Sequence, residues 1–391
     1  MDPDLSRLDE FLDESDHDGY LLDAGSELSN QRYLSGFDAE DPFLTLYTSE
    51  SLVLLTSGLE YQRAKSESRA DVVRRTSDFE YRALVDEHGR EEARSRMLVS
   101  FLEEYDVTSV ATNRRFPLYT ADALRERDVG VEPDLDDVLE EVRARKTPEE
   151  IAHIQSAQRA NESAMRAAES ALESAQIAPD GTLTLDGEAL TSERLKHTIE
   201  STLLEEGYAL DDTIVASGEA CAVPHDKGSG PIGAGETIII DIFPRSKSSG
   251  YHADMTRTFV KGEPDEATRE FFELTVEAKE AALDAIEPGV TGEGVHDVVC
   301  DVYEEAGYPT LRADESTDTG FIHSTGHGVG LDVHELPRVS REGEELEEGH
   351  VITIEPGLYD PEVGGVRLED LIVVTKDGYE NLTEYHQSFV I

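Results

Sequence analysis

The sequence predicts an α+β protein of two domains, a smaller α/β domain over residues 1–141 and a larger one over residues 142–391. A chain of 391 residues is long enough for two or three domains with ample hydrophobic cores. A strong helix-start signal stands near residue 147, and a faint internal repeat runs through the second half of the chain. These observations place the boundary near residue 142 and predict a C-terminal domain built from two αβ halves.

The N-terminal region alternates apolar runs with one long helical pattern. Residues 19–25, 43–56 and 108–113 are short apolar runs that predict strands. Residues 82–105 carry apolar side chains at helical spacing and predict one continuous helix. Strands and helix together indicate an α/β unit.

The second domain opens with a well-marked helix. Thr147 can cap its N-terminus, Pro148 suits its first turn, and Glu150 completes a capping box. From Ile151 onward, apolar residues recur every three or four positions as far as Ala168, which predicts an amphipathic helix.

The internal repeat relates residues 190–208 to residues 290–308. Both segments look like amphipathic helices, both end in Gly-Tyr, and several residues between match in register. Each copy is followed by a β-like segment, residues 213–218 after the first and 321–330 after the second. Amphipathic helices resemble each other by chance, but the shared ending favours duplication. Two such halves would leave a cleft between them, a natural place for a site.

The net charge of −52 is extreme and is spread along the whole chain. With 38% hydrophobic residues in periodic segments, a disordered acidic protein is disfavoured. We expect a folded protein from a salt-rich cytoplasm, where molar salt shortens the Debye length to about 3 Å. An acidic surface for one basic partner would instead concentrate the charge on one patch. Nucleic-acid binding is disfavoured, because phosphate contacts need clustered Lys and Arg.

The cysteine content and the lack of targeting segments agree with a cytoplasmic location. Cys221 and Cys300 are too few for a disulfide framework and fit an intracellular protein. The first fifteen residues lack the basic and apolar regions of a signal peptide, and no stretch approaches the 18 or so apolar residues of a membrane span. We therefore expect a cytoplasmic protein.

Two aspartates interrupt strongly apolar or β-rich runs. Asp241 follows three isoleucines, and Asp254 stands at the start of a second predicted strand, reached through a turn-rich segment. A lone aspartate is usually a turn or surface residue. A carboxylate in such a strand would be costly to bury without a cation or hydrogen-bond donors. The two strands look like a hairpin that brings both carboxylates together.

Three further residues have equally informative surroundings. His327 lies among glycines, which allow close backbone approach, although an exposed histidine in a glycine-rich turn would look the same. Glu355 and Glu369 each stand in an otherwise apolar strand, where either could instead pair with Arg367. Four carboxylates and one imidazole suit Mn²⁺, Co²⁺, Fe²⁺ or Zn²⁺. A bridging carboxylate can hold two such ions roughly 3.5–4 Å apart.

Two other segments resemble known motifs, a dinucleotide-binding loop and a zincin motif, but their sequence contexts do not support either. Residues 228–233 match GxGxxG, but they precede a strand and open no helix, so a dinucleotide site is excluded. His334 and Glu335 suggest a zincin motif, but Arg338 occupies the position that requires its second histidine.

The five acidic and histidine positions, in this order, resemble those of the pita-bread metallopeptidases. Residues 29–41 are similar to the creatinase-type N-terminal domain, which favours the proline-specific branch of prolidase and aminopeptidase P. The resemblance covers essentially the whole chain. It implies a creatinase-like N-terminal α/β domain, a C-terminal pita-bread domain with duplicated halves around a metal cleft, and two divalent metal ions per chain, Mn²⁺ or Co²⁺ before Zn²⁺ or Fe²⁺.

The resemblance also implies roles for individual residues. The metal ligands would be Asp241, Asp254, His327, Glu355 and Glu369. The catalytic residues would be His225, His334 and Glu355, the histidines contacting the scissile amide and its oxyanion while Glu355 shuttles a proton. By the same resemblance, His323 and Arg367 would bind substrate. Arg338 is added on its own chemistry, because a guanidinium suits a substrate carboxylate, although it could equally be structural.

The activity implied is that of a metal-dependent exopeptidase, which hydrolyses Xaa-Pro bonds in short peptides through a metal-bridging hydroxide. A homodimer is also implied, with the N-terminal domain restricting access to small substrates. Family members often have glycine where Phe243 stands, so the same fold and metals acting on a non-peptide molecule, with C–N or C–S cleavage, is the alternative. A non-catalytic binding module is disfavoured, because such modules would be expected to have lost ligands.

Overall fold

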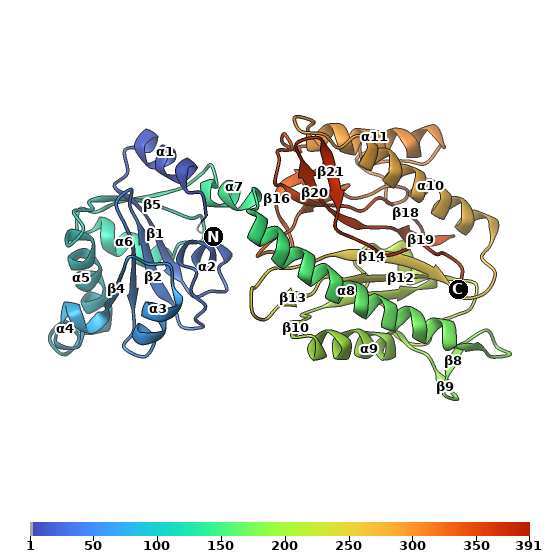
Figure 1. Ribbon diagram of the computed structural model, residues 1–391, viewed down its shortest axis with the longest axis horizontal. Coiled ribbons are helices and arrows are strands. Elements are labelled where there is room, and N and C mark those ends of the chain that lie inside the picture. The colour runs from blue at the N-terminus through green and yellow to red at the C-terminus, as the bar shows by residue number, and fades with distance from the viewer. Residues whose placement is uncertain (1–2) are drawn as a thin grey trace. The chain divides into compact units, whose positions relative to one another are not determined.

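The computed structural model describes residues 3–391 (Figure 1). Residues 1 and 2 lie outside the described residues. They belong to the predicted N-terminal domain and to the segment that was examined for a signal peptide. The chain divides into two compact units, Met1–Arg143 and Ala144–Ile391. Of the helices in the described part of the chain, none combines the length and hydropathy needed to cross a lipid bilayer.

The first unit is built on a six-stranded mixed sheet in the order β4-β3-β2-β1-β5-β6. Antiparallel pairing joins β1 to β2 and β2 to β3, and the remaining neighbours are parallel. The strands are β1 (Gly19–Ala24), β2 (Phe43–Tyr47), β3 (Leu52–Thr56), β4 (Val72–Arg75), β5 (Ser109–Thr112) and β6 (Gly130–Pro133). The helices are α1 (Ser6–Ser15), α2 (Ser29–Ser35), α3 (Tyr61–Glu67), α4 (Tyr81–His88), α5 (Arg90–Glu103), α6 (Leu118–Arg125) and α7 (Val138–Ala144), with a 3₁₀ turn at Thr76–Phe79.

The helix predicted over residues 82–105 is in fact two helices, so that prediction was wrong. Gly89 separates α4 from α5 and has φ of 81° and ψ of 168°, outside the helical region. Glycine adopts this conformation without the steric strain of a side chain.

The second unit contains two αβ halves whose helix pairs lie on opposite sides of the central strands (Figure 1). The first half has α8 (Pro148–Ser174), α9 (Ser192–Glu205) and the sheet β11-β12-β14, formed by Thr213–Ser217, Thr237–Ile242 and Met255–Val260. Small accessory pairings involve β7 (Gln176–Ile177), β8 (Leu183–Leu185), β9 (Glu188–Ala189), β10 (Tyr208–Ala209) and β13 (Arg245–Ser246), and a 3₁₀ turn spans Gly218–Ala222. Leucine and isoleucine side chains of α9 and β12 share one buried core with those of α8.

The second half has α10 (Glu266–Asp284), α11 (Gly292–Glu305) and a five-stranded sheet in the order β16-β15-β17-β20-β21. These strands are β15 (Gly326–Gly328), β16 (Glu335–Val339), β17 (Val351–Ile354), β20 (Asp370–Thr375) and β21 (Gly378–Asn381). A separate hairpin joins β18 (Gly357–Asp360) to β19 (Gly364–Arg367). Of the segment 321–330, which was expected to be β-like, only Gly326–Gly328 forms a strand, and Phe321 pairs with Thr310 in an isolated bridge.

The repeat seen in the sequence has a structural counterpart in α9 and α11. Both helices have 14 residues, and each begins after a threonine whose hydroxyl accepts a backbone N–H three residues on. Thr191 caps α9 and Thr291 caps α11. Thr147 caps α8 through a full capping box with Glu150. Such caps satisfy amide groups that the helix itself leaves unbonded.

Candidate functional site

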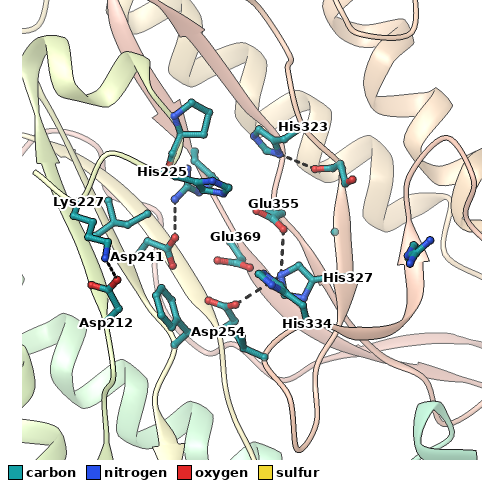
Figure 2. Close-up of a pocket in the computed structure, with 18 residues that line it drawn as sticks. Asp212, His225, Lys227, Asp241, Asp254, His323, His327, His334, Glu355 and Glu369 are labelled. Atoms are coloured by element: carbon teal, nitrogen blue, oxygen red, sulfur yellow. Dashed lines mark hydrogen bonds and ion pairs between the residues drawn. The ribbon is translucent and has the colours of Figure 1, made fainter. Parts of the chain in front are cut away.

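A pocket of about 510 Å³ opens in the second unit, and all ten residues singled out from the sequence line it (Figure 2). These are His225, Asp241, Asp254, His323, His327, His334, Arg338, Glu355, Arg367 and Glu369. They come from strands of both halves and from the loops beside them.

The hairpin of β12 and β14 positions the two aspartates. Side chains alternate across β12, so Ile240 and Ile242 enter the core while Asp241 points to the opposite face with Ile239. Asp241 lies opposite Thr256 of β14 in the antiparallel register, and Asp254 directly precedes that strand. Both aspartates therefore reach the same pocket.

Strands of the second half position the other three predicted metal ligands, His327, Glu355 and Glu369. His327 lies in β15, and its backbone N–H donates to the hydroxyl of Thr353 at 3.1 Å. A side chain on Gly326 would lie 1.9 Å from the carbonyl oxygen of Thr353, so only glycine allows the two strands this approach. Glu355 directly follows β17 and Glu369 directly precedes β20.

Asp254, His327 and Glu369 form the tightest group, with one ligand atom from each lying within 4.8 Å of the others. Glu355 adjoins this group, since its Oε1 lies 3.4 Å from Nε2 of His327. Asp241 instead forms a 2.6 Å ion pair with Arg367. Arg367, which was considered as an ion-pair partner for Glu355 or Glu369, therefore pairs with Asp241.

Burial makes the carboxylates of this group unfavourable as bare anions. Desolvation raises the pKa of Asp254 and of Glu369 well above their usual range, and neighbouring carboxylates raise each further. Desolvation likewise raises the pKa of Glu355, to about 7. Burial and the nearby His334 lower the pKa of His327 to about 3, so its imidazole is neutral at pH 7 and keeps a lone pair for a ligand.

The same residues fit divalent cations. Oδ1 of Asp241 and Oδ1 of Asp254 are buried without a hydrogen-bond partner among the described residues, which is costly for a polar atom. Cations bound beside these carboxylates would satisfy such oxygens and reverse the electrostatic penalty on burying them. Carboxylate oxygens with one imidazole nitrogen suit hard or borderline divalent ions.

Two residues that the sequence did not reveal connect and orient the site. The hydroxyl of Thr256 donates to Oε2 of Glu369 at 2.8 Å. Tyr359 accepts a hydrogen bond from Arg367 at 3.0 Å and lies 2.9 Å from Nε2 of His323. Strand alternation could have indicated Thr256, two residues after Asp254, but nothing in the sequence indicated Tyr359.

The hydrogen bonds of His323 settle its tautomer. Its Nδ1 lies 2.7 Å from the carbonyl oxygen of Ser324, which can only accept, so Nδ1 carries the proton. Nε2 then accepts from the hydroxyl of Tyr359. Burial lowers the pKa of His323 to about 3, which keeps the ring neutral.

The remaining predicted residues lie on the pocket wall. The rings of His327 and His334 meet edge to face, with centroids 4.2 Å apart. His225 follows the 3₁₀ turn of the first half and is exposed to the pocket. Arg338 belongs to β16, opposite His327 in the strand register, and no described residue forms an ion pair with its guanidinium. Phe243 lines the pocket directly after β12.

Comparison with known proteins identifies the class to which this fold and site belong. Residues 152–376 match metallopeptidase family M24, and residues 5–145 match the creatinase/prolidase N-terminal domain. The chain belongs to metallopeptidase family M24. The predicted α+β architecture, with a pita-bread domain after a creatinase-like domain, is confirmed, as is the assignment to the metallopeptidases.

Individual relatives are similar over nearly their entire length. The Xaa-Pro dipeptidase of Pyrococcus horikoshii is 31% identical over 400 residues, covering 100% of this chain and 99% of the relative. The Xaa-Pro dipeptidase of Pyrococcus furiosus is 30% identical, covering 97% of each chain. Among solved structures, the prolidase from Pyrococcus horikoshii has a TM-score of 0.78 at 31% identity, covering 98% of this chain and 99% of its own. A Xaa-Pro dipeptidase from Bacillus anthracis has a TM-score of 0.81 at 25% identity, covering 99% of each.

Proposed function

We propose that this metallopeptidase is a dipeptidase that hydrolyses the bond between a residue Xaa and a C-terminal proline. One observation carries the proposal: a single pocket holds a buried carboxylate–imidazole cluster beside Arg338, whose guanidinium has no ion-pair partner among the described residues. A dipeptide needs both a hydrolytic centre and a cation for its terminal carboxylate. The names of the Pyrococcus relatives support the same activity.

In this proposal Asp241, Asp254, His327, Glu355 and Glu369 hold two divalent ions, Mn²⁺ or Co²⁺ before Zn²⁺ or Fe²⁺. When bound, such ions lower the pKa of a water and polarise the carbonyl of the scissile bond. Thr256 orients Glu369 by its hydrogen bond, and Arg367 holds Asp241. Partners of this kind fix the orientation of a ligating side chain.

Side chains of the pocket carry out proton transfer, stabilise the developing oxyanion and bind the substrate carboxylate. Glu355, which lies 3.4 Å from His327 in the cluster, takes a proton from the attacking water and gives it to the leaving proline nitrogen. His225 and His334 donate hydrogen bonds to the carbonyl oxygen as its negative charge develops. Arg338 forms a bidentate pair with the proline carboxylate. Tyr359 and Arg367 keep His323 fixed and neutral at the pocket wall.

The wider setting belongs to the same proposal. We assign residues 1–141 to a domain that limits access to short peptides and helps to form a homodimer, and residues 142–391 to catalysis. The net charge of −52 suits a protein that works in a salt-rich cytoplasm. Because Phe243 lines the pocket, a non-peptide substrate with a C–N or C–S bond is the second candidate.

The test compares substrates on one preparation. Metal-depleted enzyme in molar KCl is reconstituted with Mn²⁺ or Co²⁺, and release of proline from Xaa-Pro dipeptides is followed beside release of Xaa from Xaa-Pro-Yaa tripeptides. We expect metal-dependent cleavage of the dipeptides. Cleavage of the tripeptides alone would make the protein an aminopeptidase, and inactivity on both with metal bound would favour the non-peptide substrate.

A further inference from the structure

An ion pair between Lys227 and Asp212 lines the active-site pocket on the side of the first half (Figure 2). Asp212 directly precedes β11, and Lys227 lies in the loop that leads to β12. The chain has only eight lysines against a net charge of −52, and Lys227 is one of them. The side chains are 63% and 41% exposed, so the pair faces both solvent and the pocket.

The backbone around this pair is firmly held. The carbonyl oxygen of Lys227 accepts from the N–H of Val215 at 3.1 Å, and Nζ of Lys196 donates to the carbonyl of Gly228 at 3.1 Å. Gly228 has φ of 70°, and a side chain there would lie 1.8 Å from the carbonyl oxygen of Val215. The backbone of the loop is therefore packed directly against β11, while the exposed side chain of Lys227 extends from it.

Asp212 is fixed more tightly than its partner. Its Oδ1 accepts from the N–H of Thr213 at 3.0 Å, which leaves Oδ2 for Lys227. Exposed ion pairs contribute little to stability, since water and salt screen them. A second carboxylate in the pocket can thus draw Nζ of Lys227 away from Asp212 at little cost.

The proposed function fixes the orientation of a dipeptide substrate in the pocket. Arg338 belongs to β16 of the second half, whereas Asp212 and Lys227 belong to the first half. With its proline carboxylate on Arg338 and its scissile bond at the carboxylate cluster, a dipeptide extends its first residue toward the first half. Ile214 and Phe243 line the pocket on this same side and provide an apolar wall for the aliphatic part of that residue.

We propose that Lys227, held by Asp212 in the free enzyme, is a specificity residue that binds an acidic side chain on the residue preceding proline. This inference rests on the proposed function and adds the class of substrate to it, dipeptides of the Glu-Pro type. Exchange of Asp212 for the substrate carboxylate leaves Lys227 paired in both states, so its charge is never left uncompensated.

The test uses Glu-Pro and Gln-Pro, two substrates of nearly equal size that differ in one charge. In Lys227→Met we expect the ratio of kcat/KM for Glu-Pro to that for Gln-Pro to fall about three- to fivefold, the size of an exposed charge pair. Lys227→Glu should in addition raise the preference for Lys-Pro over Gln-Pro. The control Lys247→Met removes an exposed lysine outside the pocket and should leave each ratio at its wild-type value.

Each outcome has a separate meaning. A Glu-Pro to Gln-Pro ratio that is the same in wild type, Lys227→Met and Lys227→Glu would overturn the inference while leaving the dipeptidase proposal intact. A wild-type enzyme that cleaves neither dipeptide with Mn²⁺ bound would overturn the proposed function and this inference with it.

Discussion

Removal of the metal should make the stability of this protein fall as the pH rises, because Asp254, Glu355 and Glu369 are buried carboxyls whose pKa values are raised. Burial raises the pKa of Glu355 from its usual 4.5 to about 7 in the folded, metal-free protein. Below pH 4.5 the carboxyl is protonated in both the folded and the unfolded chain. As the pH rises toward 7, the unfolded chain releases its proton first, so the free energy of unfolding decreases, and the loss is complete above pH 7.

The size of the effect follows from the two pKa values. Each tenfold change in proton affinity corresponds to about 1.4 kcal/mol, so ionising Glu355 costs the folded protein about 3 kcal/mol above pH 7. His323 and His327 act in the opposite direction, because burial lowers the pKa of each to about 3 and their contribution is lost as the pH falls below 6.5. The effect of Glu355 must therefore be isolated by comparison with Glu355→Gln.

The assay is urea unfolding of metal-stripped wild type and Glu355→Gln in molar KCl, at pH 5 and at pH 8. Between these two values, wild type should lose about 2–3 kcal/mol more of its free energy of unfolding than the variant does. Adding Mn²⁺ at pH 8 should restore wild type. Equal pH dependence in the two proteins would refute the electrostatic account of the cluster.

Three further predictions concern substrate, metal and salt. Arg338→Met should lower kcat/KM for Xaa-Pro dipeptides about 10- to 100-fold, mainly through KM, and an equal loss on an Xaa-Pro amide without the carboxylate would contradict its role. Thr256→Val removes the hydrogen bond to Glu369 and should weaken Mn²⁺ binding about 10- to 100-fold in a calorimetric titration, whereas wild-type affinity would show that the hydroxyl is dispensable. Lowering KCl from molar to about 0.1 M should shift the urea midpoint downward, and a constant midpoint would rule out salt-screened self-repulsion.

The carboxylates that line the pocket could be singled out from the sequence because their local settings conflict with burial. Asp241 after three isoleucines and Glu369 before an apolar strand are costly to bury alone, so the sequence itself indicates a compensating cation or hydrogen-bond donors beside them. The structure places both in one pocket. The cap at Thr147 was predicted for a different reason, because capping depends only on neighbouring residues.

Contacts between distant strands could not be predicted in the same way. The link from Asp241 through Arg367 and Tyr359 to His323 depends on how β18 pairs with β19 and on which face each strand presents. The break at Gly89 was missed because the apolar pattern continues across it, while only the backbone conformation of the glycine ends the helix. Hydrophobic periodicity indicates which face of a helix or strand is buried, but it does not indicate strand register or the position of turns.

Stoichiometric titration of Mn²⁺ into metal-free enzyme, with Ala-Pro hydrolysis and bound metal measured on the same samples, tests the central claim most directly. A pocket with five ligands for two ions predicts negligible activity without metal and a plateau once two ions are bound per chain. Full hydrolysis by the stripped enzyme, or maximal activity with a single ion bound, would contradict a dinuclear Xaa-Pro dipeptidase.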